Sequence, residues 1–144
     1  MKVSLIISTY NWPQALLRCL ESVASQTIAP FEIIIADDGS TEETKKLITL
    51  FSCTTHVPIV HVWHEDNGFR LSAIRNKAIS QAKGDYIIQI DGDVVLESHF
   101  IEDHIEIAEK GHFVCGSRVR LDEKISRKII EGKMSQPNLF NMPL

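Results

Sequence analysis

Two patterns alternate along this chain: apolar runs as long as one β-strand, and segments with apolar residues at helical spacing. Apolar runs without polar alternation are typical of strands buried on both faces of a parallel sheet. Apolar residues three or four positions apart predict amphipathic helices. Their alternation therefore predicts an α/β fold, with a mostly parallel sheet flanked by helices on both faces. The expected strands are residues 3–7, 31–36, 59–63, 86–90 and 112–116.

Helix boundaries are predicted from capping and turn residues. Pro13 follows the first strand and suits the first turn of a helix. Ser40 and Glu43 have the spacing of a capping box, which predicts that a second helix begins at Ser40. The third and fourth helices are expected at residues 72–82 and from a Ser98 cap to Gly111.

The composition fits one globular domain, because 144 residues with 44% hydrophobic and 24% charged side chains are enough for a core. The net charge of −4 argues against a general nucleic-acid binder, which presents a basic face. The N-terminal apolar run is too short for a signal peptide or a membrane span. Cys19, Cys53 and Cys115 fall within apolar patterns without a CxxC spacing, so buried free thiols and a reducing compartment are expected.

Polar clusters follow three of the expected strands, at residues 8–11, 37–40 and 91–93. The carboxyl ends of parallel strands share one edge of a sheet, where open α/β sheets bind ligands. Asp91 and Asp93 place two carboxylates close together, and like charges repel unless a cation separates them. A divalent ion such as Mg²⁺ is expected there, and Gly92 is expected to let the backbone approach the ligand. The alternative is an ordinary acidic turn.

Two common nucleotide-binding motifs are absent from the chain. It contains neither a GxGxxG fingerprint nor a Walker A sequence, which argues against a Rossmann dinucleotide site and a P-loop NTPase. An edge lined with carboxylates and hydroxyls suits a nucleotide held through its base and ribose, with a metal on its diphosphate.

Four blocks of sequence carry a family resemblance: residues 4–11 with 20–27, 32–41, 75–79 with 83–87, and 91–93. In this order they resemble family 2 glycosyltransferases, over about residues 2 to 117. The resemblance implies the GT-A fold, a nucleotide-sugar-binding α/β sandwich. It also implies a hexosyltransferase-type enzyme that transfers a sugar with inversion from a nucleotide-diphosphate donor.

The resemblance assigns roles to individual residues. Asp38 is expected to hydrogen-bond the donor base, usually uracil. Asp93 of the DxD motif is expected to bind Mn²⁺ or Mg²⁺, which neutralises charge on the leaving diphosphate. The other expected donor contacts are Thr9 and Tyr10 to the base and ribose, Asp91 to the ribose, and Arg75 to the diphosphate.

Several of these side chains have structural alternatives. Asp37 is interpreted as a cap of the following helix, and Arg75 has the alternative of pairing with a helix neighbour. His64 is a second candidate for a donor contact, within a run (residues 64–72) that resembles the chondroitin-polymerase and galactosyltransferase subgroup. Trp12 and Trp63 are predicted to be packing residues rather than sugar platforms.

Inverting transfer also needs a general base. Asp122 and Glu123 form the one acidic pair considered for it, and otherwise the base is expected beyond Leu144. Residues 1–117 are therefore interpreted as the nucleotide-sugar-binding core, and residues 118–144 as the start of a truncated acceptor-binding region. The hypothesis is a fragment that binds donor but transfers poorly. A non-catalytic nucleotide-sugar-binding module remains the main alternative, and a nucleotidyltransferase the weaker one.

The resemblance also implies partners and a location. A UDP-sugar donor and a saccharide or lipid-linked acceptor of polysaccharide biosynthesis are expected. That acceptor would place the protein in the cytoplasm, peripherally at the inner membrane face. The basic segment after Arg118 is either a membrane contact or a solvated helix. The oligomeric state stays open.

Overall fold

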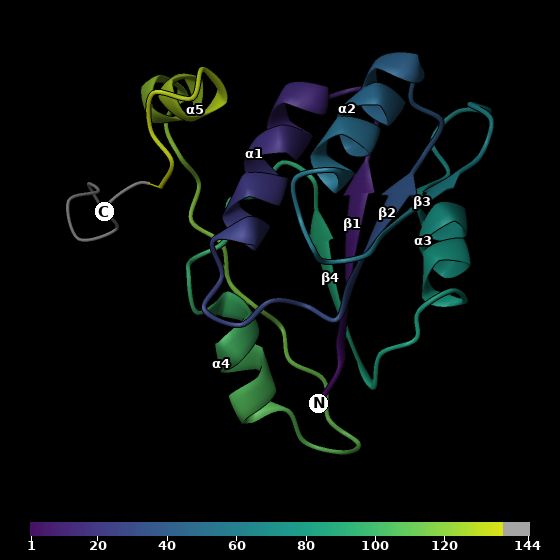
Figure 1. Ribbon diagram of the computed structural model, residues 1–144, viewed down its shortest axis with the longest axis vertical. Helices are drawn as coiled ribbons and strands as arrows, with labels where there is room; N and C mark the ends of the chain where they lie inside the picture. The colour runs from purple at the N-terminus through teal and green to yellow at the C-terminus, as the bar shows by residue number, and fades with distance from the viewer. Residues whose placement is uncertain (137–144) are drawn as a thin grey trace.

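The computed structural model describes residues 1–136. Its elements alternate between strands and helices up to α4, as the apolar patterns predict (Figure 1). In chain order they are β1 (Val3–Thr9), α1 (Pro13–Ala24), β2 (Glu32–Asp37), α2 (Glu42–Ser52), β3 (Ile59–Trp63), α3 (Leu71–Ile79), β4 (Tyr86–Asp91), α4 (Phe100–Ile107) and α5 (Glu123–Ile130).

The four strands of the described residues form one parallel sheet in the order β3-β2-β1-β4. β1 is central and pairs with β2 on one side and β4 on the other. Its register sets Ser8 opposite Asp91 and Thr9 opposite Asp37. The polar ends of these three strands therefore meet at one edge, and the predicted parallel α/β architecture is confirmed.

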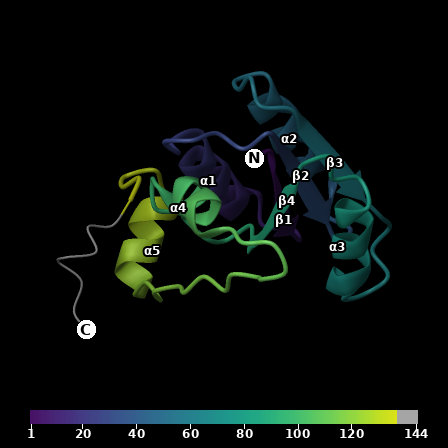
Figure 2. The same ribbon diagram turned by 90° about the horizontal axis from the view of Figure 1, so that it is seen from below.

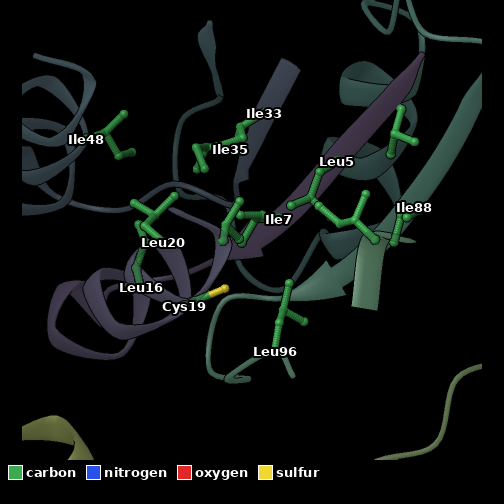
Figure 3. Packing of buried hydrophobic residues seen from close by; sticks show 13 residues of the cluster. Leu5, Ile7, Leu16, Cys19, Leu20, Ile33, Ile35, Ile48, Ile88 and Leu96 are labelled. Carbon is green, nitrogen blue, oxygen red and sulfur yellow. The ribbon is translucent and has the colours of Figure 1, made fainter. Parts of the chain in front are cut away.

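Helices cover both faces of the sheet because successive strand residues point to opposite faces. Leu5 and Ile7 of β1 face a core beneath α1, α2 and α4 (Figure 3), whereas Ile6 faces a smaller core beneath α3. Figure 2 shows α3 on the side of the sheet opposite α1. Each such fully buried Leu or Ile stabilises the fold by about 1.5–3 kcal/mol.

The strand expected at residues 112–116 does not form. Residues 108–122 carry no helix or strand, and Phe113 in this segment is 91% exposed. A short apolar run becomes a strand only where a sheet edge accepts its backbone hydrogen bonds, and no ladder reaches this segment in the part of the chain that the structure describes.

Two hydroxyls expected to cap helices have other partners. α2 begins at Glu42 after Thr41, while the Ser40 hydroxyl accepts a hydrogen bond from the Asn11 backbone N–H at 2.9 Å. α4 begins after His99, and the Ser98 hydroxyl donates to Glu97 at 2.8 Å. Neither serine caps its predicted helix, because each hydroxyl forms a hydrogen bond with a group outside that helix. The third helix, α3, is also shorter than residues 72–82, while Pro13 does begin α1.

The expectation of three buried thiols holds only for Cys19. Cys53 and Cys115 are exposed, since one ends α2 at the surface and the other lies in the irregular segment.

α5 packs against α1 through the buried Ile129, and Arg18 donates to the Ile130 carbonyl at 3.3 Å. No helix within residues 1–136 is long and apolar enough to cross a membrane. The end of the proposed 118–144 region lies outside the described residues.

Candidate functional site

A cavity of about 450 Å³ opens at the carboxyl edge of the sheet. The ends of β1 and β4, the turn after β2 and the loop before α3 line it. Its walls include Thr9, Tyr10, Asp38, Asp91 and Asp93. Five of the six residues selected from the sequence are therefore brought together around one space.

Tyr10 forms an exposed aromatic wall of this cavity. Its ring is about half exposed, and its hydroxyl donates to Asp66 Oδ2 at 2.9 Å. This hydrogen bond to a carboxylate raises the pKa of the Tyr10 phenol. Asp66 also accepts from the Gly68 backbone N–H at 3.1 Å, so Tyr10 holds the loop that precedes α3.

The two neighbouring aspartates after β2 have different surroundings. Asp37 is buried, accepts from the Ser40 N–H at 2.8 Å and contacts His61 Nε2 at 2.8 Å. It shapes the turn after β2, and its interpretation as a helix cap is wrong because the N-cap residue of α2 is Thr41. Asp38 lines the cavity, and its two oxygens contact His64 Nε2 at 2.6 Å and the Arg70 N–H at 2.9 Å.

Arg75 is fixed against the strand ends. Its Nη2 donates to Asp91 Oδ1 at 2.6 Å, and its Nε donates to the Ser8 hydroxyl at 2.8 Å. It therefore links α3 to β1 and β4 instead of pairing within its own helix. Arg118 lies further from Asp91, at 3.8 Å. The charge of Asp91 is thus balanced by protein groups.

Asp93 differs from Asp91 in having no partner among the described residues. Its carboxylate is exposed at the cavity and makes no hydrogen bond or ion pair within residues 1–136. That part of the chain holds no cluster of three His, Cys, Asp or Glu side chains able to enclose a metal ion. An open carboxylate still fits Mg²⁺ or Mn²⁺ chemistry, in which substrate phosphates and water complete the coordination.

Gly92 is required for packing within the sheet. Its N–H donates to the Ser8 carbonyl at 2.7 Å, and a Cβ at this position would lie 2.8 Å from that oxygen. The absence of a side chain thus allows close approach to β1. That Gly92 also lets a ligand approach the backbone stays a prediction, and Gly92 does line the cavity.

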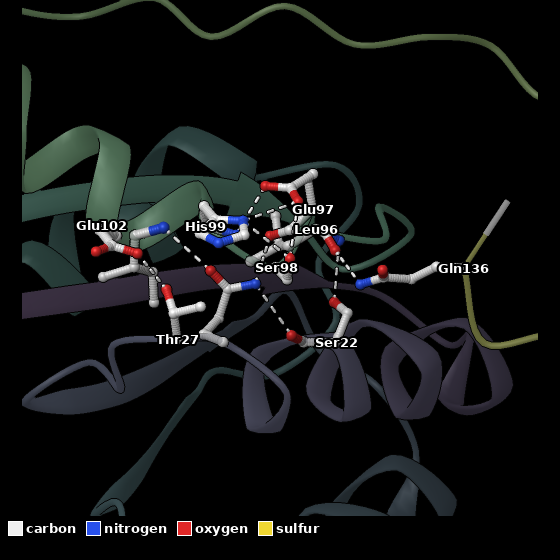
Figure 4. A network of polar contacts seen from close by, with 10 residues as sticks. Ser22, Thr27, Leu96, Glu97, Ser98, His99, Glu102 and Gln136 are labelled. Carbon is white, nitrogen blue, oxygen red and sulfur yellow. Dashed lines mark hydrogen bonds and ion pairs between the residues drawn. The ribbon is translucent and has the colours of Figure 1, made fainter. Parts of the chain in front are cut away.

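The segment after Asp93 is anchored to α1 by a polar network (Figure 4). The Gln26 amide donates to the Glu97 carbonyl at 2.6 Å, and the Ser22 hydroxyl accepts from the Leu96 N–H at 3.0 Å. Glu97 also accepts from the His99 N–H, which chiefly lowers the pKa of Glu97 to about 2. These contacts hold the chain beyond the acidic loop, and so limit where Asp93 can move.

Two aromatic residues depart from their predicted roles, and a third was not predicted. His64 is buried against Asp38 and does not line the cavity, so it is not the direct donor contact considered from the sequence. Trp12 is 47% exposed and lines the cavity, so its prediction as a packing residue is wrong. Phe69, which lines the cavity and is 87% exposed, was missed. Its only signal in the sequence was its place within residues 64–72, the run with the subgroup resemblance. Trp63 is half exposed and donates to the Ser40 carbonyl.

The acidic pair considered for the general base serves α5. The Asp122 carboxylate accepts from the Ile125 N–H at 2.7 Å as the helix cap. Glu123 pairs with Arg127 at 2.7 Å across one helical turn. Neither residue lines the cavity. Within the basic segment, residues 123–130 form a helix whose Lys124, Arg127 and Lys128 are exposed, which fits a solvated helix and a membrane contact equally.

The parallel sheet, the acidic edge and the cavity define a GT-A-type transferase fold, and comparisons with known proteins identify the family. The chain matches the profile described as "Glycosyl transferase family 2" over residues 4–141. It belongs to that family.

Curated relatives share this stretch of sequence. Glycosyltransferase GlyG of Streptococcus pneumoniae is 32% identical over 123 residues, which are 84% of this chain and 40% of that protein. Chondroitin synthase of Pasteurella multocida is 38% identical over 100 residues, or 69% of this chain and 10% of that one. The chain therefore spans less than half the length of these relatives.

Solved structures share the fold. TarS 1–349 of S. aureus in complex with UDP-GlcNAc superposes with a TM-score of 0.61 at 26% identity, covering 74% of this chain and 30% of that one. The mannosyltransferase PcManGT from Pyrobaculum calidifontis, in complex with GDP-Man and Mn²⁺, gives a TM-score of 0.66 at 21% identity, covering 76% and 33%. The second likeness concerns the fold alone.

Proposed function

We propose that residues 1–136 bind a nucleotide-diphosphate sugar, with UDP-sugar as the donor, for inverting transfer to a saccharide or lipid-linked acceptor. The observation that supports this most directly is the difference between the two acids of the DxD motif. Asp91 is balanced by Arg75, while Asp93 faces the cavity and has no partner among residues 1–136. Such an arrangement leaves one carboxylate for a cation and keeps the other as a hydrogen-bond acceptor.

In this proposal each of the other side chains contacts a different part of the donor. Asp38 accepts an N–H of the base, and the Tyr10 ring stacks on it. Asp91 accepts a ribose hydroxyl, and Arg75, which does not itself line the cavity, orients Asp91 and adds positive charge on the side of the diphosphate. Asp93 holds a divalent cation, which neutralises the charge that develops on the leaving nucleoside diphosphate.

Acceptor chemistry is a separate proposal. Asp122 and Glu123 are engaged in α5, so we assign the donor-binding half of the reaction to the described residues. This engagement also supports the second candidate, a nucleotide-sugar-binding module without turnover. A lipid-linked acceptor would bring the protein to the inner face of a membrane, where the exposed Lys124 and Lys128 of α5 suit anionic headgroups.

The first test is titration calorimetry of UDP into the protein, with and without Mn²⁺. Asp93→Ala should weaken Mn²⁺-dependent binding by about 100-fold or more, since even indirect contacts to a metal are worth 10–100-fold. The unfolding free energy should stay within about 0.5 kcal/mol, because Asp93 is exposed. Glu106→Ala, an exposed acid on α4, is the matched control and should bind as the parent does.

Two outcomes would count against the proposal. Binding that is equally strong without Mn²⁺ and in Asp93→Ala would remove the metal role of Asp93. No binding of UDP, GDP or dTDP by folded protein would remove the donor site itself. Metal-dependent UDP binding without hydrolysis of any UDP-sugar would favour the module over the enzyme.

A further inference from the structure

The donor contacts described above use Asp38 but not its buried partner, His64. Both side chains are only 5% exposed, and His64 Nε2 lies 2.6 Å from Asp38 Oδ1. His64 does not line the cavity, whereas Asp38 does. His64 can therefore act on a bound nucleotide through the Asp38 carboxylate that it contacts.

The hydrogen-bond chemistry fixes which groups donate. A carboxylate only accepts, so the hydrogen of this contact belongs to His64 Nε2. Asp38 Oδ2 accepts a second hydrogen bond, from the Arg70 N–H at 2.9 Å. The carboxylate is thus held through both oxygens, which prevents its rotation. Each oxygen keeps a further lone pair for a donor in the cavity.

The other ring nitrogen of His64 supports a dedicated role. His64 Nδ1 is buried and has no hydrogen-bond partner within residues 1–136. A buried polar atom without a partner costs stability, so packing alone does not account for a histidine here. An apolar residue would fill the space without that cost, but it would leave Asp38 Oδ1 without its donor.

The chain around His64 is placed tightly enough to fix the pair. A Cβ at Gly39 would lie 2.6 Å from Asp66 Cα, and Gly39 has a φ of +99°. The turn after β2 and the loop after β3 therefore meet backbone to backbone. Tyr10 ties the same loop through Asp66 at 2.9 Å. His64 lies at the base of this loop, whose later residues Gly68 and Phe69 line the cavity.

We infer that His64 is a positioning residue that sets the base selectivity of the cavity, and this inference rests on the proposed donor site. By holding Asp38 as a fixed acceptor, His64 makes the cavity select bases that present a ring N–H. Uracil, thymine and guanine have such a group, whereas the N3 of cytosine is itself an acceptor that would face the carboxylate lone pairs. UDP should therefore bind more tightly than CDP, and His64 should be needed for the difference.

A second Asp–His pair supplies the matched control. His61 Nε2 lies 2.8 Å from Asp37 Oδ2, between the same two strands. Asp37 does not line the cavity, and its other oxygen accepts from the Ser40 N–H. Changes at His61 therefore remove the same kind of contact without reaching the cavity acid.

The experiment compares UDP and CDP affinities in Mn²⁺ for the parent, His64→Leu, His64→Gln and His61→Leu. His64→Leu removes the donor and should lower the UDP-to-CDP affinity ratio by about tenfold, the size of one hydrogen bond to a charged group. His64→Gln keeps an N–H that can reach Asp38 and should restore most of the ratio. His61→Leu should leave the ratio unchanged even if it lowers stability. Where His64→Leu does not fold, His64→Asn replaces it, because its amide is too short to reach Asp38.

The outcomes separate this inference from the donor proposal. Metal-dependent binding of UDP and CDP with equal affinity by the parent would overturn the inference and leave a nucleotide site. An unchanged ratio in folded His64→Leu, or an equal loss for both nucleotides, would also overturn it, since His64 would then serve the structure only. Failure of the parent to bind either nucleotide would instead overturn the proposed donor site.

Discussion

Both ends of the sheet carry acids, but the surroundings of these acids differ. At the amino end, Glu32 is 3% exposed and accepts from the Ser4 hydroxyl and the Lys83 N–H, each at 2.6 Å. The Ser4 hydroxyl in turn accepts from the Gly84 N–H at 2.8 Å. At the carboxyl end, Asp93 has no such partner within residues 1–136. An acid enclosed by its own chain stabilises the fold, whereas an acid facing a cavity is available to a ligand.

The largest expected effect on stability is at the enclosed end. Glu32→Ala should lower the free energy of unfolding by about 1–3 kcal/mol, because the Ser4 hydroxyl and the Lys83 N–H lose their shared acceptor. Glu32→Gln keeps an acceptor oxygen and should cost less. Urea denaturation measures both. The comparison would fail if folded Glu32→Ala lost Mn²⁺-dependent UDP binding as Asp93→Ala is expected to.

A smaller effect is expected from His104, which lies beside Tyr86 at the start of β4. Its Nδ1 is 3.2 Å from the Tyr86 hydroxyl, and burial lowers the pKa of His104. The unfolded chain then binds the proton more readily, so stability is complete above about pH 6.5 and falls as the pH drops below it. Because the group is partly solvated, the loss should be below about 1 kcal/mol.

Denaturation midpoints between pH 7.5 and 5 test this, with His104→Phe expected to flatten the slope. His99→Gln is the control with the opposite sign. Glu97 raises the pKa of His99, so the contribution of His99 is present below pH 6.5 and fades as the pH rises through its folded value. A steeper loss in acid for His104→Phe than for the parent would contradict the assignment.

The smallest expected effect concerns Cys19, which lies in the core next to the backbone of the cavity residue Asp91. Cys19 is buried 4.0 Å from the Asp91 carbonyl, and burial raises the pKa of its thiol to about 12. Exposed Cys53 and Cys115 should therefore react with an alkylating reagent first, followed slowly by Cys19. UDP with Mn²⁺ at four times its Kd should slow Cys19 a further ~5-fold if labelling requires the site to open. Mass spectrometry of each cysteine measures this, and fast labelling of Cys19 would contradict it.

The sequence predicts the fold and the location of the site because both depend on local patterns. Apolar runs of strand length, interrupted by helical spacing, suffice for a parallel sheet, and parallel strands necessarily bring Asp38, Asp91 and Asp93 to one edge. Family membership and the GT-A fold follow from the same blocks. The exposure of Trp12 and Phe69 depends on how loops pack, which spacing does not encode.

The hydrogen-bond and ion-pair partners of side chains on different elements were less predictable. Ser40 and Ser98 are residue types that often cap helices. In the structure, however, the Ser40 hydroxyl bonds the Asn11 N–H and the Ser98 hydroxyl bonds the Glu97 carboxylate. Arg75 has helix neighbours in sequence, yet it reaches Asp91 on another element. His64 is followed in sequence by the acids Glu65 and Asp66, yet its partner is Asp38 in the turn after β2. Such choices depend on distances that appear only after the sheet has formed.

The strand order has a consequence for how the protein is made. β1 precedes the other three strands of the described sheet in the chain and is an inner strand, but its neighbour on one side is β4, the latest of the four. Pairings between segments distant in sequence form slowly, because the long intervening loop must be ordered first. The unit formed by β1, α1, β2, α2 and β3 can assemble while β4 is still inside the ribosome, which leaves one edge of β1 unpaired. A nascent chain therefore exposes an apolar strand edge, which is a template for misassociation. Pairing of β4 with β1 covers this edge and at the same time completes the acidic edge of the sheet.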